Sequence, residues 1–128
     1  MKCIIISLTL LLMALLIGAC TQKLEPTVSQ EEAIAIASTC LHPNIVAEAE
    51  INAWLEPKLG PHGTWHVTFD NLEVTREDLG WQEGPDTLLA PVDVYKIVLI
   101  NVDAGTGDIL LKNATTGPKL GGPPPDVP

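Results

Sequence analysis

The sequence predicts an α+β protein: an N-terminal helix packed on a small antiparallel β-sheet, preceded by an apolar leader and followed by a Gly/Pro tail that is expected to be disordered. Between residues 29 and 43, apolar residues recur at helical spacing. Over residues 64–70 and 92–112, β-branched and aromatic residues follow strand patterns. A helix with one apolar stripe and a sheet with one apolar face cover each other, so we expect a two-layer fold.

The first 19 residues have the parts of a secretory signal peptide. Lys2 precedes an apolar run from Ile4 to Ile17, which is short for the alternative, an uncleaved transmembrane helix. Cys20 directly follows Ile17-Gly18-Ala19, an arrangement that resembles the lipobox of bacterial lipoproteins, in which the cysteine is acylated and becomes the first mature residue. Since two or more acyl chains hold a protein firmly, we expect an anchor in the membrane through acylated Cys20.

Residues 20–27 are the expected lipidated tether, because they are polar and contain Pro26. A lipid anchor places the protein in the cell envelope, on the extracytoplasmic side of a bacterial membrane. Thr21 and Gln22 lack the aspartate that resembles an inner-membrane retention signal. The expected location is therefore the outer membrane where the cell has two membranes.

Composition limits the partners of the chain. About 109 residues remain after the leader, enough for one small domain. Lys2 leaves with the leader and no acidic residue does, so 6 Lys and Arg face 16 Asp and Glu and the net charge becomes −10. Nucleic acid is not an expected partner, because phosphate binding needs a basic surface. Cys3 lies in the leader and Cys20 is assigned to lipid, so Cys40 has no partner for a disulfide and is expected to be a buried, inert thiol.

The first ordered element is expected to be a helix. It begins at Ser29-Gln30-Glu31-Glu32, which has the form of a capping box, and Pro43 is expected to end it. The glutamates near its start suit the positive end of the helix dipole. Its predicted inward face consists of Ala33, Ile36, Ala37, Cys40 and Leu41.

The next two segments are expected to pair as a hairpin. Val46 to Leu55 alternates apolar and polar residues as a strand does, whereas its Ala and Glu content favours a helix; we interpret it as a strand. Pro57 to Gly63 is rich in turn residues. In the following strand, alternation directs Trp65 and Phe69 inward.

The second half should contain one helical turn and a second hairpin. Thr75-Arg76-Glu77-Asp78 repeats the capping-box form ahead of a glycine. Gly84 to Pro91 is expected to be a loop, and Val92 to Val102 a central strand. The glycines of Asp103-Ala104-Gly105-Thr106-Gly107-Asp108 suit a tight reversal into a strand over Asp108 to Lys112. Residues 115–128 are the expected disordered tail; Pro123-Pro124-Pro125 could alternatively be a ligand for a proline-recognition domain.

The order of these parts resembles the PepSY domain, which occurs in peptidase propeptides and in a spore-germination protein. The likeness covers residues 28–114. It is carried by the opening helix from Val28, the Trp65-to-Phe69 strand, and most specifically Tyr95 to Leu110 with its Asp-Ala-x-Thr-Gly-acid turn. The resemblance implies a helix on an antiparallel sheet and a role in restraining or modulating peptidases outside the cytoplasm. It supplies no catalytic residues, so we expect a binding module and not an enzyme.

No cofactor or metal site is expected. His62 and His66 are four residues apart, but Pro61 and Gly63 oppose a helix there and a strand would spread the two imidazoles apart. His42 has no local imidazole partner. Gly105-Thr106-Gly107 is followed by a strand and not by the helix that a phosphate site needs. Among serines, threonines and histidines, no spacing of a nucleophilic enzyme is present.

Two tryptophans are candidates for contact with a partner. Trp54 points opposite to the apolar face of its strand, and Trp81 falls in a predicted loop. The function expected from the sequence is a membrane-anchored extracytoplasmic binding lipoprotein that modulates or inhibits a peptidase or another envelope protein. The alternative is a structural or stress-related envelope lipoprotein that binds a small ligand and has no link to peptidases.

Overall fold

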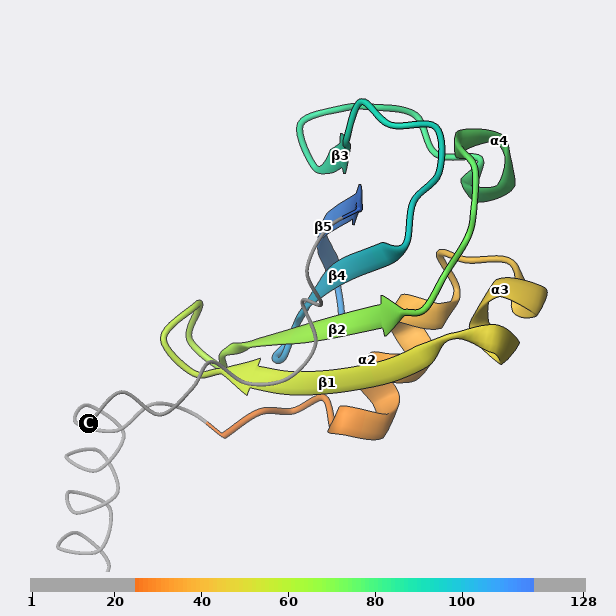
Figure 1. The fold of residues 1–128 in the computed structure, drawn as a ribbon. Coiled ribbons are helices and arrows are strands. Elements are labelled where there is room, and N and C mark those ends of the chain that lie inside the picture. The colour runs from red at the N-terminus through yellow and green to blue at the C-terminus, as the bar shows by residue number, and fades with distance from the viewer. Residues whose placement is uncertain (1–24, 117–128) are drawn as a thin grey trace, which may run out of the picture.

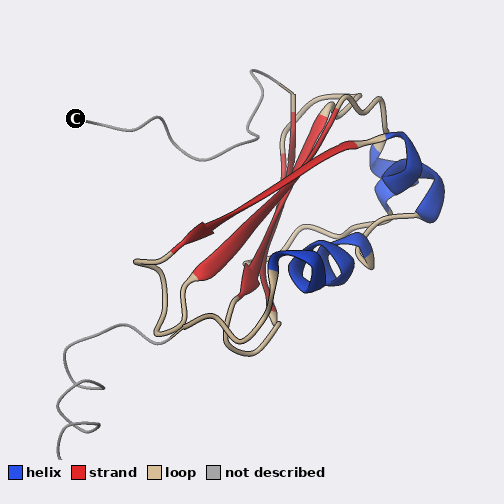
Figure 2. Ribbon diagram, turned by 90° about the horizontal axis from the view of Figure 1, so that it is seen from below, coloured by secondary structure: helices blue, strands red, loops and turns tan. Residues whose placement is uncertain are grey.

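A computed structural model describes residues 25–116 of the chain. The signal peptide, the acylation site Cys20, the first part of the tether and nearly all of the predicted tail lie outside the described residues. The described part is an α+β fold, in which five strands form one sheet and the helices lie on one side of it (Figures 1 and 2). The predicted α+β class is therefore confirmed.

The sheet is mixed and not wholly antiparallel as predicted. Its strand order is β1-β2-β4-β5-β3. Four antiparallel strands form most of it: β1 (Glu50–Glu56), β2 (Thr64–Asp70), β4 (Ile97–Asp103) and β5 (Ile109–Thr115). The fifth strand, β3 (Thr87–Leu89), runs parallel to β5 at the far edge. The prediction of a loop over Gly84 to Pro91 is wrong here, because three residues are too few to display a strand period.

Helix α2 (Gln30–Ser38) is the predicted N-terminal helix. The Ser29 hydroxyl accepts a hydrogen bond from the Glu32 amide at 3.1 Å, so one of the two bonds of the predicted capping box caps the helix. Ala33 and Ala37 are fully buried on its inward face. The helix ends at Ser38, earlier than predicted from Pro43, and the hydroxyls of Ser38 and Thr39 bond to carbonyls one turn back.

Pro43 begins a helix instead of ending one. It occupies the first turn of α3 (Pro43–Glu48), where its missing N–H has no partner to lose. The ambiguous segment from Val46 to Leu55 is therefore divided: its first three residues are helical, and strand β1 begins at Glu50. The prediction of one continuous strand is wrong at its start, because the Ala- and Glu-rich part continues the helix that Pro43 opened.

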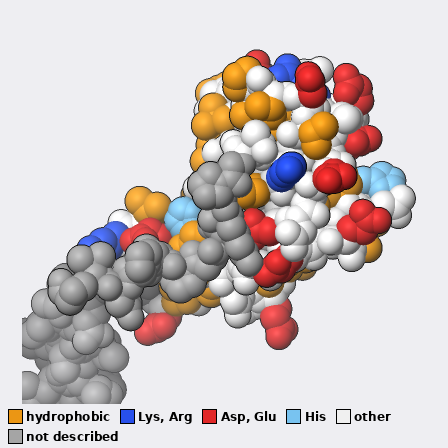
Figure 3. Space-filling view, in the orientation of Figure 1, with side chains coloured by type: hydrophobic (Ala, Val, Ile, Leu, Met, Phe, Trp, Pro, Cys, Tyr) orange, Lys and Arg blue, Asp and Glu red, His pale blue; other side chains and the backbone are white. Residues whose placement is uncertain are grey.

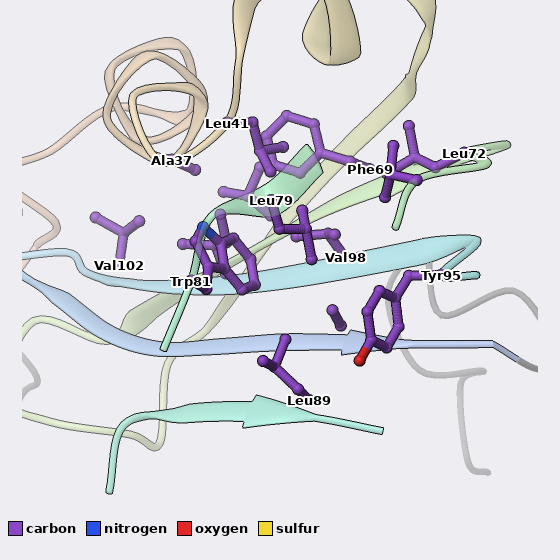
Figure 4. Packing of buried hydrophobic residues seen from close by; sticks show 14 of the residues in the cluster. Ala37, Leu41, Phe69, Leu72, Leu79, Trp81, Leu89, Tyr95, Val98 and Val102 are labelled. Atoms are coloured by element: carbon purple, nitrogen blue, oxygen red, sulfur yellow. The ribbon is translucent and has the colours of Figure 1, made fainter. Parts of the chain in front are cut away.

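The core lies between the sheet and the helices. Val67 and Phe69 of β2 face the same side as Val98 and Ile100 of β4, and all four side chains are fully buried. Figure 4 shows Ala37 and Leu41 facing this layer, with Leu79, Trp81 and Tyr95 beside it. Phe69 thus points inward as predicted. Trp65 packs on the same side, half-buried, and its indole N–H donates to the Val28 carbonyl at 2.7 Å.

The connection from β2 to β4 contains the predicted helical turn. In α4 (Arg76–Leu79) the side chains of Thr75 and Asp78 each accept the other's backbone N–H, and Gly80 ends the turn in the left-handed conformation with φ +69°. The predicted strand from Val92 is shorter than expected, since β4 begins only at Ile97. Tyr95 instead bonds to Val74, where the connection passes beside it.

The second hairpin turns as predicted at residues 103–108. The Asp103 carboxylate accepts hydrogen bonds from the amides of Gly105 and Thr106 at 2.7 and 3.0 Å. These bonds hold the pKa of the Asp103 carboxyl below its ordinary value. Gly107 supplies the left-handed residue, with φ +81°, that returns the chain into β5.

Phe69→Ala should destabilise the fold by about 3–5 kcal/mol, because a fully buried ring is replaced by a cavity between β2 and the helices. Urea unfolding followed by circular dichroism measures the change. The matched control is Leu110→Ala, at a position that is 41% exposed, which should change the free energy of unfolding by less than about 0.5 kcal/mol. Equal losses for the two variants would contradict this account of the core.

Asp103→Asn should flatten the acid side of the stability profile. The folded-state pKa of Asp103 lies below its unfolded value, so its ionisation contributes stability that is complete at neutral pH and lost as the pH falls through the folded-state pKa. The difference in unfolding free energy between wild type and variant should therefore change with pH only below about pH 5. Denaturant titrations across the acid range test this, and a difference that is constant with pH would contradict it.

Candidate functional site

The most distinctive surface of the described chain is the face of the sheet that the helices leave open. Alternation places Asn52 and Trp54 of β1, His66 and Thr68 of β2, and Leu99 and Asn101 of β4 on this open face. The helices lie on the other side (Figure 2). Trp54 is half-buried and stacks on His66 across the strand pair, with ring centroids 5.2 Å apart and planes 19° apart. The expectation that Trp54 points away from the core is confirmed.

Two polar oxygens on the open face are buried without a hydrogen-bond partner among the described residues. They are the Thr68 hydroxyl and the side-chain carbonyl oxygen of Asn101. Thr68 itself is fully buried, in the row that continues through Leu99. A buried polar group without a partner costs about 1–3 kcal/mol. The open face therefore carries hydrogen-bonding capacity that the described residues do not use.

The adjoining edge strand β1 presents backbone groups at the border of the sheet. The side-chain amide of Gln30 donates to the Ala53 carbonyl at 2.8 Å. This carbonyl thus faces away from β2, and since backbone groups alternate along an antiparallel pair, those of Ile51 and Leu55 face outward too. Such an edge accepts an added strand unless something covers it. Gln30 covers one acceptor in the middle of this edge.

Trp81 does not form the exposed contact that the sequence suggested. Only 8% of its surface is exposed, and its indole N–H donates to the Cys40 carbonyl at 2.9 Å. The Nζ of Lys112 lies 4.9 Å from the ring centroid, a cation–π geometry. The prediction failed because a tryptophan in a long connection was taken as exposed, whereas this connection folds over the helical side of the sheet and places Trp81 in the core.

Cys40 is half-buried at the end of α2 and packs against the core. Burial raises the pKa of its thiol, while Lys112 and a hydrogen bond with Thr39 oppose the change. The thiolate, which is the reactive form, is therefore less populated than in a free cysteine. The structure corrects the prediction on one point, because the side chain is partly exposed and not fully buried.

Each of the three histidines makes a different contact. The Nδ1 atom of His42 accepts from the Asn44 amide at 3.2 Å and caps α3, and His66 stacks on Trp54. The Nδ1 atom of His62 lies 2.8 Å from the Glu25 carbonyl. Within residues 25–116, no three His, Cys, Asp or Glu side chains are grouped so that they could hold a metal ion.

A polar cleft of about 920 Å³ lies where α3 meets the connection after β2. Among its charged lining residues, four carboxylates outnumber the one cation, Lys96, and the apolar lining residues are Ile45, Leu72, Val74 and Ile97. Acidic side chains are also spread over the side of the molecule seen in Figure 3, where basic ones are sparse. The cleft therefore suits a small cationic ligand better than an anion. Its acidic residues are Glu48, Asp70, Glu73 and Asp78.

Sequence reasoning missed the roles of two residues at the β1 edge and the open face of the sheet. Gln30 was assigned only to the start of a helix, and its bond to β1 could not be foreseen because the two residues are 23 positions apart. His66 was considered as a metal ligand, although alternation already placed it beside Trp54 in a predicted hairpin. Its stacking could have been inferred from the register of that hairpin.

Comparisons with known proteins found no matching family model, no matching curated protein and no matching solved structure. In the part of the chain that the structure describes, no helix is both long and apolar enough to cross a membrane.

Proposed function

We propose that this chain is a membrane-anchored extracytoplasmic lipoprotein of the PepSY-like class, which modulates a peptidase or another envelope protein by binding it. The observation that carries the proposal is the edge strand β1, whose outward backbone groups lie beside the Trp54–His66 stack. An extended partner segment added to this edge would gain main-chain hydrogen bonds, and the aromatic stack would receive one of its side chains.

The partner should have a basic or neutral contact surface. The mature chain carries a net charge of −10, and β1 itself begins and ends with glutamates. Like charges across an interface cost several kcal/mol, so an acidic partner would be rejected. Strand addition also requires that the Gln30 side chain release the Ala53 carbonyl, because both donors compete for the same acceptor. The Gln30 bond therefore lowers the affinity of this edge for an added strand.

A second candidate function is a structural or stress-related envelope lipoprotein that holds a small ligand. The acidic cleft near α3 favours it, since a volume of about 920 Å³ is within the range of small-molecule sites. The ligand would be a small cation with polar groups. Isothermal titration with a polyamine such as spermidine tests this candidate. If the wild-type protein gives no heat of binding, the small-cation candidate is rejected.

The anchor is tested on the mature protein isolated from a bacterial envelope. Intact mass spectrometry should find Cys20 as the first residue carrying fatty acyl chains, because the residues before it resemble a lipobox. Cys20→Ser should leave an unmodified chain that detergent phase partition recovers in the aqueous phase. An intact Met1 in the wild-type protein would overturn the lipoprotein proposal.

Partner binding at β1 is tested by proximity labelling from the anchored protein in its native envelope. Ala53→Pro removes an outward N–H and should reduce labelling of the partner at least about tenfold, which corresponds to about 1.4 kcal/mol. Gln30→Ala frees the acceptor and should increase labelling.

The matched control is Leu88→Ala, at a 49% exposed position on the opposite edge strand, which should leave labelling unchanged. Circular dichroism checks that each variant is folded. If Gln30→Ala is folded and neither it nor Ala53→Pro alters labelling, the edge is not the binding site.

A further inference from the structure

The loop between β1 and β2 differs in composition from the rest of this acidic chain. Residues 57–63 include no Asp or Glu, although the chain has 16 of them. Pro57 to Pro61 are all exposed, and three of these five residues are apolar. Leu59 is 48% exposed and follows the cation Lys58. The described chain thus presents an apolar and basic loop at one end of the sheet.

The backbone of this loop is held in one shape by the residues around it. The Thr64 hydroxyl donates to the Leu59 carbonyl at 3.0 Å. Gly60 and Gly63 take the left-handed conformation, with φ +79° and +91°, which glycine adopts without steric cost. Leu59 is therefore presented to solvent by a fixed turn. A contact made by a fixed turn loses little conformational entropy.

The same end of the sheet holds the start of the described chain. The Nδ1 atom of His62, within the loop, lies 2.8 Å from the Glu25 carbonyl. The amides of Thr27 and Val28 both donate to the Ala104 carbonyl at 2.8 Å. Figures 1 and 2 show the first described residues and the β1–β2 loop at one end of the molecule. The tether therefore joins the domain beside the loop.

The tether is too short to hold this end of the domain far from a membrane. Glu25 follows Cys20 by five residues, which span at most about 18 Å when fully extended. Leu59 precedes His62, the neighbour of Glu25, by three residues, or at most about 11 Å. An acyl chain on Cys20 therefore keeps Leu59 within about 30 Å of the lipid. Tethering of this kind gives a weak contact an effective concentration on the order of millimolar.

We propose that residues 57–63 form a second contact between this protein and the membrane that holds its anchor. The side chain of Leu59 enters the interfacial region of the bilayer, where it leaves water, and Lys58 lies among the phosphates of the headgroups. This inference rests on the lipid anchor of the proposed function and adds a docking surface to it.

The carboxylates of the acidic cleft lie at the other end of the sheet. Asp70, which lines the cleft, ends β2, whereas Thr64 begins this strand beside the loop. Six steps of strand separate the two residues, or about 20 Å. This exceeds the Debye length of about 8 Å at physiological ionic strength. With the loop on the lipid, anionic headgroups therefore repel the cleft only weakly.

Acidic side chains near the loop limit what electrostatic attraction contributes. They are Glu25, Glu56, Asp103 and Asp108. The Asp103 carboxylate accepts hydrogen bonds from two amides of its own turn, but it keeps its charge. These charges offset that of Lys58, so burial of Leu59 carries most of the contact. The contact should therefore persist on neutral lipid.

This contact also sets how β1 stands relative to the membrane. The strand ends at Glu56, directly before the loop, so it leads away from the lipid surface. Its outward edge then stays in water, and a partner segment can reach Ala53 from the side. The membrane contact and the strand addition proposed at β1 are therefore compatible.

The experiment uses the mature protein with its acyl chains, placed in phosphatidylcholine nanodiscs that contain a nitroxide-labelled lipid. Paramagnetic broadening of backbone amide resonances in NMR spectra reports which residues lie at the lipid. The amides of Leu59 and Gly60 should be broadened. Those of Asp78 and Leu79, in α4, should keep their line widths.

Three variants make the test specific. Leu59→Ser removes the apolar side chain and should largely abolish the broadening of the Gly60 amide. The matched control is Leu88→Ser, at a 49% exposed position on β3, which should leave this broadening unchanged. Lys58→Gln should reduce the broadening in phosphatidylglycerol nanodiscs and not in phosphatidylcholine. Circular dichroism checks that each variant is folded.

Equal broadening of the Gly60 amide in the wild type and in Leu59→Ser would overturn the proposal, because the tether alone would then account for it. Absence of broadening in the wild type would overturn it too. A second arm attaches the Cys20→Ser chain to a nickel-chelating lipid through an N-terminal hexahistidine tag. There, a loop that shows no broadening dependent on Leu59 contradicts the contact, whether or not Cys20 carries lipid. Failure of the proposed anchor appears separately, as a missing acyl chain in the mass spectrum.

Discussion

The packing of α2 on one side of the β2–β4 pair is the interaction on which the rest of the structure depends. Ala33 and Ala37 are small enough to bring the helix close to the sheet, where Val67 and Ile100 are fully buried. A chain of this size has apolar residues for one such layer. None of the described helices lies over the other face of the sheet, and its side chains are mixed: aromatic, amide, hydroxyl and apolar.

Because the described helices lie on one side of the sheet, the two candidate binding surfaces lie next to each other. The open face and the β1 edge meet at Trp54, which belongs to both. A strand added at this edge would bond to the backbone of β1, and one of its side chains would lie against Trp54. The Gln30 amide restricts the edge, and the acidic surface restricts which partners approach. The binding proposed at β1 therefore depends on release of the Gln30 bond and on the charge of the partner more than on a preformed pocket.

The helical side has a different task. The connection between β2 and β4 passes over it, and Trp81 closes the core by bonding to the Cys40 carbonyl. The hydroxyl of Tyr95 donates to the Ala90 carbonyl at 2.8 Å. This bond joins the residue that follows β3 to the segment that leads into β4. These bonds satisfy polar groups that would otherwise be buried without partners. The connection thus serves stability, although its tryptophan first suggested a contact with a partner.

The sequence by itself determined the elements whose patterns are local: the capped start of α2 at Ser29, the Thr75 capping box, the turn at Asp103 and the inward position of Phe69. Tertiary structure alone decided the parallel pairing of β3, the burial of Trp81 and the Gln30 bond to Ala53. The physical reason is range. Capping and alternation act over a few residues, whereas a three-residue strand or a single side chain takes its place from contacts with segments far away in the chain.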